Sequence, residues 1–169
     1  SSAHRVADGW TYGFPEVTGR DDVACASRVS NPGCYPTGFI ALLAPLIRKG
    51  LLPSDWPYTC HAVSGYSGGG KALIGRFEDD ADIAYRDYAL GLGHKHVPEM
   101  QAQCGLAHPP VFAPAVIPAH RGMIVEVPLH LENLDRGSHR GDDGFGQRGV
   151  GVERPDRFGQ VQRSFRHRY

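Results

Sequence analysis

A change in composition near residue 131 limits how much of this chain can form a packed core. The last 39 of the 169 residues hold eight of the 15 arginines and seven of the 22 glycines, and no lysine. Apolar residues are sparse there and keep neither a helical nor a strand period. We therefore predict an Arg/Gly-rich, disordered tail over residues 132–169. An out-of-frame reading of a GC-rich gene is a second hypothesis for it, and an intact reading frame through residue 169 on resequencing would contradict that hypothesis.

The charge and cysteine patterns exclude several classes of protein. Lys plus Arg and Asp plus Glu are 18 each, so the chain has no strong attraction to nucleic acid or anionic membranes. The tail has a net charge of only +2 (eight basic and six acidic residues), which leaves nucleic-acid binding as a minor alternative. No apolar run approaches the ~20 residues of a membrane span. The first ten residues do not have the layout of a signal peptide, and they suggest the start of a fragment.

The four cysteines, Cys25, Cys34, Cys60 and Cys104, are spaced by 9, 26 and 44 residues and include no Cys-x-x-Cys pair. This spacing argues against a zinc ribbon and against a secreted disulfide framework. We predict a cytoplasmic chain with reduced thiols and no metal site.

The body of the chain, residues 1–131, shows regular periods. A helical apolar face follows Pro36 and ends before Gly50, and it consists of Phe39, Leu42, Leu43, Leu46 and Ile47. Pro36 suits the first turn and Gly50 suits the end, whereas Pro45 predicts a kink or a lost hydrogen bond.

Short strands and a second helix follow this helix in the sequence. We predict strands at 58–63, 111–117 and 123–131, with residues 118–122 connecting the last two, and a helix that begins near Val97 and Pro98. Pro128 places the last strand at an edge or a bulge. The element order predicts an α+β fold with a mixed, partly antiparallel sheet and flanking helices.

The segment Asn31-Pro-Gly-Cys-Tyr-Pro-Thr37 places Cys34 directly before the predicted helix. Backbone N–H groups and the helix dipole at that position favour a thiolate, and they could hold an oxyanion after the thiolate attacks a carbonyl. Gly33 allows a ligand to approach the backbone. The alternative is a buried, inert cysteine, because free cysteines are among the most buried residues.

The segment Gly93-His-Lys-His-Val-Pro-Glu99 offers a base for such a nucleophile, because histidine exchanges protons near neutral pH. Two histidines two residues apart are not expected to face one site equally. His96 is preferred over His94 since it adjoins the helix start and Glu99. The alternative is a surface histidine, and no spacing here matches a zinc site.

The loop Ser64-Gly-Tyr-Ser-Gly-Gly-Gly-Lys71 is too rich in glycine for regular structure. Its free backbone and Lys71 suit an anion. It is not a P-loop, because Ala72 follows the lysine where Ser or Thr is required. A plain flexible loop is an equal interpretation.

Together these strings, with Ala3-His-Arg5 and Trp10-Thr-Tyr-Gly-Phe-Pro-Glu16 before them, closely resemble the N-acetyl-gamma-glutamyl-phosphate reductase family in its shorter form. The resemblance covers residues 1–131. It implies an incomplete catalytic domain of the glyceraldehyde-3-phosphate-dehydrogenase type. Residues 1–30 would be a remnant of the dinucleotide-binding half, and residues 31–131 part of the catalytic and dimerisation domain.

The resemblance also implies an activity and a set of site residues. The activity is the NADP-dependent reduction of N-acetyl-L-glutamyl 5-phosphate to the semialdehyde in arginine biosynthesis, in a homo-oligomer. Cys34 would be the nucleophile that forms a thioester, and His96 the acid/base residue. The implied substrate contacts are Asn31, Ser64 and Glu99, and the implied cofactor contacts are Gly65, Ser67, Gly68 and Gly69. No Gly-x-Gly-x-x-Gly is present, so the alternative is a non-catalytic remnant that lacks the cofactor half.

Overall fold

The structure is a computed structural model that describes residues 2–79 and 82–130. These residues all belong to one unit, Ser1–Gly137. The predicted tail over residues 132–169 lies outside the described residues. The boundary predicted near residue 30 stays a prediction.

A four-stranded mixed sheet in the order β4-β5-β3-β6 carries the fold. Its two central strands, β3 (Thr59–Gly65) and β5 (Val111–Ile117), are parallel, with Cys60 opposite Phe112. The short edge strands, β4 (Arg86–Asp87) and β6 (Met123–Glu126), run antiparallel to β5 and β3 respectively. The predicted α+β class with a mixed sheet is therefore confirmed. The strands at 111–117 and 123–126 are not a hairpin, because β3 lies between them.

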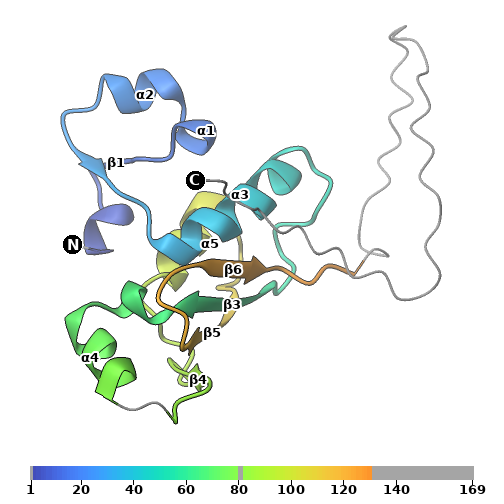
Figure 1. The fold of residues 1–169 in the computed structure, drawn as a ribbon. Helices are drawn as coiled ribbons and strands as arrows, with labels where there is room; N and C mark the ends of the chain where they lie inside the picture. Colours follow the sequence, from blue (N-terminus) through green and yellow to red (C-terminus); the bar gives the residue numbers. More distant parts are fainter. Residues whose placement is uncertain (1, 80–81, 131–169) are drawn as a thin grey trace, which may run out of the picture. The chain divides into compact units, whose positions relative to one another are not determined.

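Helices α3 (Cys34–Arg48) and α5 (Val97–Cys104) pack together on one face of this sheet (Figure 1). Phe39, Ile40 and Met100 are fully buried between the two helices and the sheet. The strands contribute Cys60 and Phe112, which are also fully buried. Burial of these apolar side chains fixes α3 and α5 relative to the ends of the strands.

The predicted helix after Pro36 is present, and it begins two residues earlier, at Cys34. Gly33 is extended and caps it, and the backbone N–H and Oγ1 of Thr37 both donate to the Gly33 carbonyl, at 3.1 and 2.9 Å. The helix ends with Gly50 at φ +66°, the left-handed conformation that glycine adopts without strain. Pro45 lies inside the last turns, where its missing N–H removes one hydrogen bond without ending the helix.

Two predicted boundaries were wrong. The strand predicted to end at residue 63 continues to Gly65, and the glycine-rich segment after it forms a regular 3-10 helix, η2 (Tyr66–Gly69). Backbone bonds from Tyr66 and Ser67 to the 119–120 carbonyls, at 3.0 and 3.1 Å, hold that turn. The last strand ends at Glu126, although Val127 and Leu129 still pack on the core, and its edge position agrees with Pro128.

Several short elements have no clear sequence signal. The first part of the chain holds η1 (Ser2–Arg5), β1 (Thr11–Tyr12), α1 (Pro15–Thr18), α2 (Arg20–Ala24) and β2 (Val29–Ser30), and α4 (Lys71–Asp79) follows η2. β1 and β2 form a separate parallel pair. Tyr12 joins the main hydrophobic core, which ties this region to α3 and α5.

Candidate active site

Cys34 is the first residue of α3, and its side chain is exposed. The first N–H groups of a helix have no partner within the helix, so they can bind a negative group. The alternative interpretation of Cys34 as a buried cysteine is therefore wrong, and its role as a nucleophile stays a prediction. Burial raises the pKa of the Cys60 and Cys104 thiols to about 12, which makes those two thiols unreactive near neutral pH.

Because Gly33 has no side chain, His96 and Glu99 pack closely against the backbone directly before Cys34. A Cβ atom at Gly33 would lie 2.6 Å from Glu99 Oε1 and 2.7 Å from both Cδ2 and Nε2 of His96. Any larger residue at position 33 would push these groups away. The space that a side chain at Gly33 would need is thus occupied by His96, the N-cap of α5, and by Glu99 in its first turn.

The Glu99 carboxylate holds the Gly33 turn in place through three hydrogen bonds. This carboxylate is almost fully buried and accepts from Arg5 Nη1 at 2.7 Å, from the Tyr12 hydroxyl at 2.9 Å and from the Gly33 N–H at 3.0 Å. Arg5 Nε also donates to the Asn31 carbonyl at 2.9 Å. Three donors from separate parts of the chain compensate the cost of burying this charge. Glu99 therefore ties the N-terminal region to the cysteine turn.

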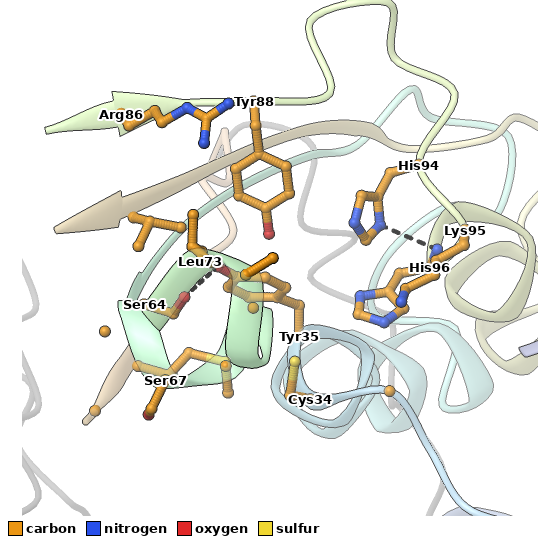
Figure 2. Close-up of a pocket in the computed structure, with 18 of the residues that line it drawn as sticks. Cys34, Tyr35, Ser64, Ser67, Leu73, Arg86, Tyr88, His94, Lys95 and His96 are labelled. Atoms are coloured by element: carbon orange, nitrogen blue, oxygen red, sulfur yellow. Dashed lines mark hydrogen bonds between the residues drawn. The ribbon is translucent and has the colours of Figure 1, made fainter. Parts of the chain in front are cut away.

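His94 and His96 both line the same pocket, and the preference for His96 over His94 as the acid/base residue stays a prediction (Figure 2). Their ring centroids are 4.5 Å apart, and His94 Nδ1 accepts the His96 backbone N–H at 3.1 Å. The chain turns here in a helical conformation instead of alternating as a strand does. Burial above all, with His94, Arg5 and Lys95 nearby, lowers the pKa of His96 to about 3. Burial and Lys95 also lower the pKa of His94.

A neutral His96 imidazole thus lines the same pocket as Cys34. His96 Nδ1 is buried and has no hydrogen-bond partner within residues 2–79 and 82–130. Near neutral pH such a ring can accept a proton but has none to give as an imidazolium. The acid/base role assigned to His96 stays a prediction.

Tyr35 and Tyr88 form the wall above Cys34. The Tyr35 hydroxyl donates to Ser64 Oγ at 2.7 Å, and a weaker contact of 3.3 Å reaches the Ala115 carbonyl. Figure 2 shows the Tyr88 hydroxyl directed toward Tyr35. Burial, the hydrogen bond with Tyr35 and the nearby Cys34 raise the pKa of Tyr88, so this phenol stays protonated. Tyr35 of α3, Ser64 of β3 and Tyr88, which follows β4, thus line the same pocket as Cys34.

These residues line a pocket of about 930 Å³. Seven of the nine predicted site residues line it: Cys34, Ser64, Gly65, Ser67, Gly68, Gly69 and His96. The two that do not are Asn31, which is exposed, and Glu99, which is buried behind Gly33. The structure thus gathers segments that are far apart in sequence into one site. The role assigned to each residue stays a prediction.

The glycines of the predicted cofactor loop are not equivalent. A Cβ at Gly65 would lie 2.5 Å from the Ala119 carbonyl, so the backbone packing alone requires this glycine. A Cβ at Gly68 would meet nothing closer than Ser64 Oγ at 3.9 Å. Gly68 therefore has open space on the pocket side, where a ligand can approach the backbone.

Sequence reasoning missed the cations of the pocket. Arg5, Arg76, Arg86 and Lys95 line it, and no Asp or Glu does. Arg5 belongs to Ala3-His-Arg5, one of the segments that carry the family resemblance, and this was the sequence signal available for it. Arg76 and Arg86 lie on α4 and β4, two elements without a clear pattern, so their convergence could not be foreseen.

Residues 2–79 and 82–130 contain no group of three or more His, Cys, Asp or Glu side chains placed to hold a metal ion. Within the same residues, every helix is too short or too polar to cross a membrane.

Comparison with known families agrees with this architecture. Residues 34–140 match the semialdehyde dehydrogenase, dimerisation domain family. The chain belongs to this family, whose matched segment begins at Cys34 and includes α3, the mixed sheet and α5.

Individual relatives carry a more specific name, which confirms the resemblance inferred from the sequence. The chain is 51% identical over 145 residues to N-acetyl-gamma-glutamyl-phosphate reductase 2 of Nostoc sp., a match that covers 80% of this chain and 45% of the relative. It is 51% identical over 144 residues to N-acetyl-gamma-glutamyl-phosphate reductase of Burkholderia cenocepacia, covering 81% and 46%. It is 50% identical over 139 residues to N-acetyl-gamma-glutamyl-phosphate reductase 2 of Pseudomonas putida, covering 79% and 44%. The chain thus spans somewhat less than half the length of these curated relatives.

Proposed function

We propose that this chain carries the acyl-transfer centre of an N-acetyl-gamma-glutamyl-phosphate reductase, an oxidoreductase of arginine biosynthesis. The observation that carries the proposal is the exposed Cys34 at the start of α3, in a pocket that has four cations and no acidic side chain. An acyl phosphate is an anion, so such a pocket favours it. The names of the relatives supply the particular substrate, N-acetyl-L-glutamyl 5-phosphate.

The chemistry begins with attack by the Cys34 sulfur on the acyl carbon. The neutral His96 takes the thiol proton as the carbon–sulfur bond forms. The bond between the acyl carbon and the phosphate oxygen then breaks, and phosphate leaves with the electron pair. The product is a thioester on Cys34 and an imidazolium at His96. Free N–H groups at the start of α3 stabilise the oxyanion on the way.

The cofactor proposed for the second half is NADP. Gly68 on η2 offers open backbone in the pocket, which fits contact with one end of a dinucleotide. The described residues contain no complete nucleotide-binding fold, so the fit extends only to Gly65, Ser67, Gly68 and Gly69. When bound, NADPH supplies the hydride that reduces the thioester carbon. His96 returns its proton to Cys34 when the aldehyde departs.

The substrate roles predicted for Asn31, Ser64 and Glu99 enter this proposal differently. Ser64 lines the pocket and accepts from Tyr35, so its hydroxyl can still donate to a ligand. The Glu99 carboxylate already accepts three hydrogen bonds, and the backbone carbonyl of Asn31 accepts one from Arg5 Nε. These contacts support positioning roles for Glu99 and Asn31.

The proposal includes a homo-oligomer in the cytoplasm. The matched family is described as a dimerisation domain, and β5 and β6 expose Val111 (42%) and Ile124 (62%) on the sheet. Exposed apolar side chains of this kind favour contact with a second copy. All four cysteines are free, as the reducing cytoplasm would keep them.

Acylation of Cys34 tests the function without any cofactor. The chain is incubated with acetyl phosphate or N-acetyl-L-glutamyl 5-phosphate, and intact mass and released phosphate are measured. We expect one acyl adduct that hydroxylamine removes, since thioesters are cleaved by this nucleophile. Cys34→Ser should abolish the adduct, whereas Cys25→Ser, which removes the other exposed thiol, should retain it. No adduct, or equal acylation of Cys34→Ser, would overturn the proposal.

A further inference from the structure

Arg86 is a half-buried cation of the pocket to which the proposed chemistry gives no role. Within residues 2–79 and 82–130 it has no ion-pair partner, in contrast to Arg5, which is paired with Glu99. A guanidinium on a pocket wall with free donors is suited to a carboxylate, which it can bind through two parallel hydrogen bonds.

The backbone fixes where Arg86 stands. It lies on β4 opposite Val116 of β5, and the Tyr88 N–H continues this pairing by donating to the Pro114 carbonyl at 3.2 Å. Residues two apart on an extended chain point to the same side, about 7 Å apart. Arg86 and Tyr88 therefore both face the pocket, and Figure 2 shows Arg86 on the side away from His94, Lys95 and His96, with Tyr88 between, its ring 5.7 Å from that of His94.

Tyr88 relates the position of Cys34 to that of Arg86 in the pocket. Figure 2 shows its hydroxyl directed toward Tyr35, the residue next to Cys34, and all of these residues line one pocket. Arg86 comes two residues before Tyr88 on the same side of the extended chain, so a substrate held at Cys34 would extend past Tyr88 to reach its guanidinium. In a glutamyl chain the α-carboxylate is four bonds from the side-chain acyl carbon.

We propose that Arg86 binds the α-carboxylate of the substrate and so selects acyl phosphates that carry a second acidic group at this distance. The inference rests on the proposed function and adds a specificity-determining residue to it. Arg76 also lines the pocket, but it is exposed on α4, and we assign it no such role.

Protection of Cys34 from iodoacetamide tests this assignment with two matched ligands. N-acetylglutamine keeps the α-carboxylate and has an amide on its side chain, whereas N-acetylisoglutamine has these two groups exchanged. The half-protecting concentration of each is measured for the unsubstituted chain, for Arg86→Gln and for Arg20→Gln. Arg20 is an exposed arginine of α2 outside the pocket and serves as the control.

We expect Arg86→Gln to raise the half-protecting concentration of N-acetylglutamine about tenfold, the size of a lost charge-assisted pair. The value for N-acetylisoglutamine should stay the same, which also shows that the variant is folded, and Arg20→Gln should change neither. Equal shifts for both ligands, no shift, or no protection by N-acetylglutamine in the unsubstituted chain would overturn the inference. Acylation of Cys34 is scored separately, so a chain that is acylated but shows Arg86-independent protection contradicts this inference alone.

Discussion

The two walls of the Cys34 pocket are built in different ways. One wall, formed by the starts of α3 and α5, carries Cys34 and His96 and rests on buried apolar residues and on the Glu99 carboxylate. The other wall, formed by η2, α4 and β4, carries exposed glycines and cations without ion-pair partners in the described part of the chain. The first wall is held by buried contacts, whereas the second offers these cations and the open backbone at Gly68. In the proposed function, the first wall would hold the reacting groups and the second would bind the ligand.

The largest expected effect on the first wall is its sensitivity to acid. His96 has its pKa lowered from 6.5 to about 3, so the folded chain resists its protonation and the unfolded chain does not. This stabilisation is complete above pH 6.5 and is lost as the pH falls toward 3. The full loss is on the order of 5 kcal/mol, of which about 2 kcal/mol falls between about pH 7 and pH 5.

Urea unfolding at several pH values checks this expectation. His96→Gln should remove most of the acid-dependent loss, while the exposed His108→Gln should lose stability in acid as the unsubstituted chain does. Parallel curves for His96→Gln and the unsubstituted chain would show that His96 is not held neutral by burial.

Gly33→Ala is expected to disrupt the first wall directly. The new methyl group would lie within 2.7 Å of Glu99 and His96, two buried side chains that cannot easily move. We expect a loss of about 3 kcal/mol in the free energy of unfolding and slower reaction of Cys34 with iodoacetamide. Gly91→Ala is the matched control, because its Cβ would meet nothing within 4 Å and its φ is not positive. If both variants unfold at the same urea concentration, the close approach to Gly33 is not structural.

Glu99→Gln should weaken the same wall somewhat less. An amide has one acceptor oxygen for three converging donors, and its NH₂ would face one of them. The expected loss is about 2 kcal/mol, measured by urea unfolding. Glu126→Gln removes the exposed pair with His61, which spans 3.0 Å at the surface of the sheet, and should cost less than about 0.5 kcal/mol. Similar losses for the two variants would contradict the anchoring role of Glu99.

The smallest effect on stability is expected at the second wall. Gly68→Ala places a methyl group in open space, so the free energy of unfolding should change by less than about 0.5 kcal/mol. Gly65→Ala, by contrast, forces a methyl group against the 119–121 backbone and should destabilise the chain clearly. A large loss of stability in Gly68→Ala would mean that this glycine serves the fold and not a ligand.

The sequence predicted the parts of this molecule that local chemistry determines. The apolar period after Pro36 and Gly50 at its end predicted α3, and Pro98 with Glu99 predicted α5. The string around Cys34 predicted that this cysteine stands at a helix start, with its burial left open. The family resemblance pointed to seven of the residues that line the pocket, in three separate segments.

The remaining features depend on contacts between distant segments. The 3-10 conformation of η2 depends on carbonyls near residue 120, and the burial of Glu99 depends on Arg5 and Tyr12, which are 94 and 87 residues away. Arg86 reaches the pocket because β4 pairs with β5, and a two-residue strand leaves no periodic signal. Local patterns contain no information on such convergence.

The rate of alkylation at Cys34 relative to Cys25 tests the central claim most directly. Both thiols are exposed, but Cys34 begins α3 and Cys25 follows the end of α2, so only Cys34 has free N–H groups around it. Iodoacetamide labelling followed by peptide mass spectrometry gives both rates in one sample. We predict that Cys34 reacts at least several-fold faster in the folded chain and that the difference disappears in urea. Equal rates in the folded chain would contradict an activated nucleophile at Cys34.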